Sequence, residues 1–220
     1  MIIAERKPIT EIKGYLTGHR RVLVLGCGGC VTVCLAGGAR EVAVLAGLLR
    51  IAGEATISEA TIERQCDAEF FESVKKEAEA CDAILSMACG VGVQMAAQIF
   101  SSKPVYPALN TKFMGTNDGP GQWSENCLAC GDCKLGIFGG ICPVTRCSKS
   151  LLNGPCGGSS KGKCEVDPEH IECGWQLIYD RLRTLGRLDV LEKIEPPRDW
   201  SKTHAGGPRR LLRTDVANLI

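Results

Sequence analysis

Hydrophobic residues in the first half of the chain follow two alternating patterns. Short runs rich in β-branched residues, such as Arg21–Leu25 and Ala83–Met87, are typical of strands buried in a parallel sheet. Between these runs, apolar residues recur every three or four positions, which indicates helices with one buried face. The expected strands are Arg21–Leu25, Ala55–Ile62, Ala83–Met87 and Lys103–Leu109, and the expected helices are Ile9–Leu16, Gly38–Ala52, Ala68–Ala80 and Val91–Phe100.

Strands that alternate with helices predict the α/β class, with an open, mostly parallel, four-stranded βαβ sheet. Lys103–Leu109 is expected at an edge of the sheet, because its prolines cannot donate hydrogen bonds to a neighbouring strand. In sheets of this kind, ligands bind beyond the carboxyl ends of the strands.

The periodic pattern ends near Asn110, and glycine, proline and cysteine dominate from there to Lys163. We interpret Gly115–Gly121 as a linker or loop, and we expect this region to depend on bound metal for its organisation. Two helices follow, Ile171–Leu185 and Leu188–Ile194, and the tail after them is expected to lie on its own domain or on a partner. The predicted segments are an α/β cluster-binding domain (1–112), a cysteine-rich, ferredoxin-like, irregular cluster region (113–166), and a helical segment with a partner-binding tail (167–220).

Composition narrows the class of protein. The chain has 220 residues, 45% of them hydrophobic, and a formal net charge of +1, which gives no reason to expect nucleic acid or anionic lipid as a partner. No apolar run is as long as a membrane span, and the amino-terminal residues do not resemble a signal peptide, so we expect a cytoplasmic protein. Fourteen cysteines in such a chain indicate metal binding or redox chemistry, because the cytosol disfavours disulfides.

Five cysteines in the irregular region have the spacing of iron–sulfur ligands. Cys127, Cys130 and Cys133 are each separated by two residues, and Cys142 is followed directly by proline, with Cys147 further on. Three closely spaced cysteines and a later Cys-Pro favour a [4Fe–4S] cluster. Zinc is the main alternative, although its four thiolates usually come as two separated Cys-x-x-Cys pairs. The sequence leaves open whether Cys142 or Cys147 is the fourth ligand.

A second set of cysteines lies just after the predicted strands. Cys27, Cys66 and Cys89 each follow a strand end, so they are expected to converge in space, and Cys30 lies one turn from Cys27. These four residues form a second candidate metal site. Cys34, on the same helix face as Cys30, is a fifth candidate, and the alternative is that these are small buried residues.

Other chemistry is less well supported. The glycine-rich loop after the first strand has Val31 where a dinucleotide-binding loop would have a third glycine or alanine, which argues against a nucleotide. Cys156 and Cys164 are open to metal binding, zinc binding or simple packing. No paired carboxylates or activated histidine are present, so we expect no acid–base catalysis from this chain itself.

Several longer motifs resemble a known family. The motifs are Gly140-Ile-Cys-Pro-Val-Thr-Arg-Cys147, Leu151-Leu-Asn-Gly-Pro-Cys-Gly-Gly158, Gly162-Lys-Cys-Glu165, Gly26-Cys-Gly-Gly-Cys30, Glu63-Arg-Gln-Cys66 and Pro196-Pro-Arg-Asp-Trp200. The C-terminal motifs are similar to those of the methylenetetrahydrofolate reductase C-terminal domain family, and the N-terminal ones to the iron–sulfur small subunits, of MetV type, of bacterial two-subunit reductases.

This resemblance implies a non-catalytic subunit with two [4Fe–4S] clusters, with zinc as a replacement at one site. It implies a separate catalytic partner that contains the flavin, FMN, and reduces methylenetetrahydrofolate in the Wood–Ljungdahl pathway, and it allows further electron-donor subunits. The clusters would pass electrons to that flavin, or, alternatively, only stabilise the complex. The ligands it implies are Cys27, Cys30, Cys66 and Cys89 for one cluster, and Cys127, Cys130, Cys133 and either Cys142 or Cys147 for the other.

Overall fold

The computed structural model describes residues 1–53, 55–213 and 215. The chain divides into two compact units, Met1–Ser124 and Glu125–Ile220. The three segments expected from the sequence stay a prediction. The end of the expected partner-binding tail, residues 216–220, lies outside the described residues.

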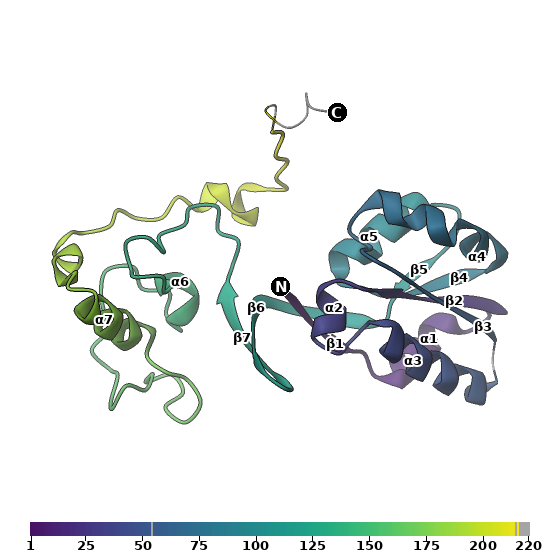
Figure 1. Ribbon diagram of the computed structural model, residues 1–220, viewed down its shortest axis with the longest axis horizontal. Coiled ribbons are helices and arrows are strands. Elements are labelled where there is room, and N and C mark those ends of the chain that lie inside the picture. The colour runs from purple at the N-terminus through teal and green to yellow at the C-terminus, as the bar shows by residue number, and fades with distance from the viewer. Residues whose placement is uncertain (54, 214, 216–220) are drawn as a thin grey trace. The chain divides into compact units, whose positions relative to one another are not determined.

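The first unit contains the expected four-stranded sheet, and all of its recorded strand pairs are parallel (Figure 1). The register pairs Cys27 with Ile62 and Gly26 with Met87, so three strands end at nearly the same level. This common edge is where the sequence placed its first candidate site. In order across the sheet, the strands are β3 (Thr56–Ile62), β2 (Arg21–Cys27), β4 (Ala83–Met87) and β5 (Val105–Pro107).

Helices cover both faces of this sheet because its central strands are apolar on both sides. Val22 and Val24 of β2 pack in one buried cluster, and Leu23 and Leu25 pack in the other. The first cluster includes residues of α1 and α3, and the second includes residues of η1, α4 and α5 (Figure 1). These helices are α1 (Ile9–Leu16), α3 (Ala39–Ala52), η1 (Ala68–Val74), α4 (Lys75–Ala80) and α5 (Gly90–Ile99), with the short α2 (Cys30–Val33) after β2.

A second, three-stranded sheet was not expected from the sequence. It consists of β1 (Ile2–Arg6), β6 (Leu109–Gly119) and β7 (Gln122–Cys127), with β6 in the centre and antiparallel to β1. The interpretation of Gly115–Gly121 as a linker or loop was therefore wrong for most of this stretch, because Gly115–Gly119 belongs to β6 and only Pro120 and Gly121 connect it to β7. The pattern misled because these strands are largely exposed and rich in asparagine, glycine and threonine, which gives no clear apolar alternation.

The second unit has little regular structure and a small core. Its longest helix is α7 (Gly174–Thr184), and one buried cluster joins this helix to Phe138. No helix among the described residues is long and apolar enough to cross a membrane. The other short elements here are α6 (Pro143–Arg146), η2 (Leu188–Glu192), η3 (Trp200–Lys202) and η4 (His204–Gly206).

Asp82 forms an ion pair at the start of β4. Its carboxylate accepts hydrogen bonds from the backbone amides of Arg20 and Arg21, at 3.2 and 3.0 Å, and lies 2.6 Å from the Arg21 guanidinium. The hydrogen bond from that guanidinium holds the pKa of the Asp82 carboxyl below its ordinary value. The charged form of Asp82 therefore stabilises the folded chain.

We expect Asp82→Asn to lower the melting temperature by a few degrees near neutral pH, because the amide keeps the shape of the side chain but removes its charge. A lowered pKa contributes stability above the unfolded-state value of about 4, and this contribution is lost as the pH falls through the folded-state value. The difference from the parent protein should therefore disappear in acid. Melting curves across this pH range test the prediction, with Glu77→Gln, an exposed carboxylate of α4, as the control. A difference that persisted in acid would contradict it.

Candidate metal centres

Four cysteines from three separate stretches of the chain line one cavity at the carboxyl edge of the parallel sheet. Cys27 is the last residue of β2, and Cys30 begins the short helix α2. Cys66 follows the end of β3, and Cys89 precedes α5 after β4. The topology of the sheet therefore brings these thiols together, as the sequence predicted, and their role as metal ligands stays a prediction.

The electrostatics of Cys66 support this convergence. Its thiol lines the cavity although part of the residue is exposed, and desolvation by the surrounding protein raises its pKa. The neighbouring thiols of Cys27 and then Cys89 raise it further, and Arg64 acts weakly in the opposite direction. Thiols that influence each other's charge lie close together, and a bound cation would have to displace their protons.

Gln65 positions the loop that contains Cys66, and the sequence analysis did not identify Gln65 as part of the site. Its side chain is fully buried, and Nε2 donates to the carbonyl oxygens of Leu25 and Gly26, at 2.8 and 3.0 Å. Its Oε1 accepts a hydrogen bond from the Ser86 hydroxyl at 2.7 Å. Gln65 therefore ties the loop that contains Cys66 to the ends of β2 and β4. A lone glutamine in a sequence gives no signal of this role, because its partners are backbone atoms distant along the chain.

Two other cysteines of this unit do not line the cavity. The Cys34 thiol is buried and lies 3.7 Å from the carbonyl oxygens of both Ala4 and Val31. The Cys81 thiol packs in the opposite apolar cluster and lies 3.0 Å from the Ala78 carbonyl. Burial raises the pKa of both thiols, so both are stable as neutral groups. The structure thus gives Cys34 the contacts of a core residue.

The size of the cavity fits a cluster better than one ion. Its volume is about 230 Å³, several times the ~30 Å³ that one water molecule occupies in the liquid. Four thiolates around one zinc ion lie ~2.3 Å from it and leave no such space. Within the described part of the chain, no group of three or more cysteine, histidine or acidic side chains is arranged to hold a single metal ion. The ligands of a [4Fe–4S] cluster bind different irons and therefore stand further apart.

The second candidate set is more open. Cys127 ends β7 and accepts a hydrogen bond from the Ala129 amide at 3.4 Å, and both Cys127 and Cys133 are exposed. Cys130 is half-buried, beside the guanidinium of Arg198. The spacing from Cys127 to Cys133 keeps these three thiols on one short loop.

The two candidates for the fourth ligand have different surroundings. Cys147 packs against the apolar cluster of this unit. Cys142 precedes α6, is outside that cluster, and receives a hydrogen bond from the Thr145 hydroxyl, with the two atoms 3.6 Å apart. Of the two, Cys142 has the more polar surroundings, which suit a thiolate.

Cys156 and Cys164 also have polar partners. The Gly158 amide donates to the Cys156 sulfur at 3.4 Å, and the Ser148 hydroxyl lies 3.3 Å from the Cys164 sulfur. The hydrogen bond with Ser148 lowers the pKa of the Cys164 thiol, and backbone amides add to the effect. Cys164 is therefore more easily ionised than an ordinary cysteine.

Arg198 is the second residue that the sequence analysis missed. One guanidinium nitrogen, Nη2, lies 2.5 Å from the Cys130 sulfur and also donates to the Asp132 carbonyl. The Nε atom of Arg198 is buried and has no hydrogen-bond partner in the described chain. A buried donor without an acceptor is rare in proteins. An additional acceptor at this loop, such as a cluster sulfur, would satisfy it, so the residues present fit a cluster here.

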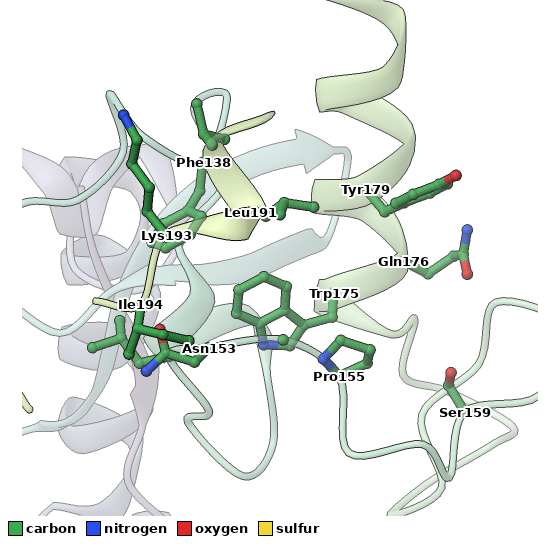
Figure 2. Close-up of a pocket in the computed structure, with 13 residues that line it drawn as sticks. Phe138, Asn153, Pro155, Ser159, Trp175, Gln176, Tyr179, Leu191, Lys193 and Ile194 are labelled. Carbon is green, nitrogen blue, oxygen red and sulfur yellow. The ribbon is translucent and has the colours of Figure 1, made fainter. Parts of the chain in front are cut away.

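A larger cavity, of about 430 Å³, lies elsewhere in the second unit and contains none of the cysteines (Figure 2). Trp175 lies between Asn153 and Ile194 on one side and Pro155 and Gln176 on the other. The volume of this cavity is in the range of small-molecule sites. However, the two amide side chains that line it, Asn153 and Gln176, already donate hydrogen bonds to Glu195 and Asp180. No pattern in the sequence predicts this cavity. Its lining is mostly apolar.

Comparison with known families gives one match, in the C-terminal part of the chain. Residues 106–201 match the family described as Methylene-tetrahydrofolate reductase C terminal. The matched residues include the Cys127–Cys147 cysteines, Cys156, Cys164 and Arg198. They do not include the four cysteines of the first cavity, which lie before them.

The match supports the family resemblance drawn from the C-terminal motifs, over less than half of the chain. A search of curated proteins and a search of solved structures each returned no match. The link to a methylenetetrahydrofolate reductase therefore depends on this C-terminal region.

Proposed function

We propose that the chain is an iron–sulfur, electron-transfer small subunit, of MetV type, of a methylenetetrahydrofolate reductase complex. It binds two [4Fe–4S] clusters and passes electrons to a catalytic partner, which holds the flavin FMN and makes 5-methyltetrahydrofolate in the Wood–Ljungdahl pathway. The complex is cytoplasmic. The match of residues 106–201 to the reductase C-terminal family supports the type of complex.

The observation that supports cluster binding best is the cavity lined by Cys27, Cys30, Cys66 and Cys89. These four thiols come from three parts of the chain that are distant in sequence, and packing alone does not require them to meet in one apolar cavity. When bound, a [4Fe–4S] cluster supplies one-electron transfer. The protein's part is to orient the four thiols, to exclude water with apolar lining residues, and to keep the loop of Cys66 in place.

The second cluster is assigned to the loop from Cys127 to Cys133, with Cys142 as its fourth ligand. The apolar surroundings of Cys147 and the polar contact of Cys142 support this choice. The unpartnered Nε of Arg198 supports an additional acceptor beside Cys130. Zinc remains the alternative metal for this loop.

Iron and sulfide analysis of protein prepared without oxygen tests the proposal. We expect roughly eight irons and eight sulfides per chain, and an EPR signal that appears on reduction. Anomalous scattering at the iron edge should place one group of irons at each cysteine set. A protein with one zinc and no iron would contradict the proposal.

A structural role is the second candidate, and the small core of the second unit favours it. Among the described residues, the buried cluster of this unit contains five residues, too few to organise the whole of Glu125–Ile220 without further support. A purely structural metal would not accept electrons from the donor of the complex. Rapid mixing of the complex with its reductant, followed by freezing and EPR, separates the two: cluster reduction faster than turnover supports electron transfer, and none supports a scaffold.

A further inference from the structure

The segment after Pro197 returns to the cysteine loop and covers one side of it. Arg198 contacts the Cys130 sulfur and the Asp132 carbonyl oxygen through Nη2. Eleven residues later, Arg209 donates to the carbonyl oxygens of Ala129, at 3.3 Å, and of Lys202, at 2.5 Å. Two arginines of the tail are therefore bound to the same short loop, one at a sulfur and one at backbone oxygens.

The backbone of the loop is adapted to this close approach. Gly131 has a φ of +81°, and a Cβ atom at that position would lie 2.7 Å from the Lys202 carbonyl oxygen. Only glycine adopts this conformation readily and leaves room for the tail. The tail therefore contacts the loop through its backbone at Lys202 as well as through the side chains of Arg198 and Arg209.

The charge of Arg198 is not neutralised by a carboxylate. No ion pair of Arg198 is recorded in the described chain, whereas the nearby Lys134 lies within 4 Å of carboxylate oxygens of Asp132 and Glu195. The guanidinium also lies near the Trp200 ring, 5.6 Å from its centroid. Removing an unpaired cation partly from water is unfavourable in free energy unless negative charge lies nearby.

We propose that Arg198 is the residue that sets the reduction potential of the cluster at Cys130. The inference rests on the proposed function, because it requires a cluster on the Cys127–Cys133 loop. A cluster with four thiolate ligands is negatively charged, and each added electron increases that charge. A fixed guanidinium close to its sulfurs favours the reduced form, through charge and through hydrogen bonds from Nη2 and the unpartnered Nε. Arg198 is a positioning and electrostatic residue, not a ligand.

The test is a redox titration of the whole complex, or of the isolated full chain, monitored by EPR. We expect Arg198→Met to lower the midpoint potential of one cluster only, with a fall of about tenfold in the ratio of reduced to oxidised cluster at a fixed potential, or about 59 mV for one electron. Arg198→Lys should recover part of the shift. The matched control is Arg209→Met, which removes an equal charge from the same tail but contacts only carbonyl oxygens.

The outcomes separate this inference from the proposed function. Wild-type protein without iron would overturn the proposed function. Full iron content in Arg198→Met with an unchanged potential, or an equal shift in Arg209→Met, would overturn the inference alone. If Arg198→Met fails to load iron, Arg198→Gln, which keeps N–H donors without charge, takes its place under the same criteria.

Discussion

Replacing Cys66 with alanine should remove about half of the iron, roughly four atoms of eight. The Cys66 thiol lines the cavity with three other cysteines, and its pKa responds to two of them. Loss of this thiolate leaves three ligands from only two stretches of the chain, Cys27 with Cys30 at the end of β2 and Cys89 after β4, and opens the cavity to water. Iron and sulfide content of the variant, prepared without oxygen, measures the effect, and the EPR signal of the other cluster should remain.

Cys34→Ala is the matched control for this experiment. Cys34 lies near the same sheet edge, but its thiol contacts backbone carbonyls within the core. The control should therefore keep its full iron content and lose only a little stability. Equal iron loss in both variants would mean that Cys34 is also a ligand and that the four-cysteine assignment is wrong. Full iron content in Cys66→Ala would exclude Cys66 as a ligand.

Gln65→Leu should destabilise the first unit by about 2–3 kcal/mol. The substitution leaves two buried carbonyl oxygens, of Leu25 and Gly26, and the hydroxyl of Ser86 without their amide partner. The leucine side chain is also confined, because a Cβ placed on Gly92 would lie only 2.8 Å from the Gln65 Cβ. Hydrogen exchange of amides in β2 and β4, followed by mass spectrometry, measures the opening free energy of this unit alone.

The control is Gln94→Leu, a helical glutamine whose side chain is exposed and donates to the Gly90 carbonyl at 3.0 Å. It should change the opening free energy by less than about 0.5 kcal/mol. Gln65→Leu should also weaken retention of iron at the first site, because the loop of Cys66 loses its attachment. If hydrogen exchange in β2 and β4 does not change, the buried amide is not essential to this edge of the sheet.

Much of the first unit could be predicted because its signals are local. Apolar runs and helical periodicity located β2, β3 and β4 within a few residues. The alternation of strands and helices also predicted that this sheet is mostly parallel. The helix expected over Ala68–Ala80 instead begins as a 3₁₀ segment and becomes α-helical only at Lys75. Helix ends and types depend on packing against neighbours, which the pattern does not contain.

Some residues of the candidate sites could be predicted from the sequence, and others could not. Cysteine spacing and the position of cysteines after strands were enough to name the first four residues, because the carboxyl ends of parallel strands meet at one edge. Gln65 and Arg198 could not be found, since their partners are backbone atoms or a sulfur far along the chain. The three-stranded sheet was missed because β6 and β7 are largely polar and exposed and lack alternation.

The sequence by itself determined the α/β class, the parallel sheet and the supply of thiols at regular spacing. These follow from side-chain periodicity and from the short reach of the chain between neighbouring cysteines. Only the tertiary structure decided which thiols share a cavity, which are buried in the core, and which cation faces a sulfur. Those outcomes depend on contacts between residues far apart in sequence, and no local pattern encodes them.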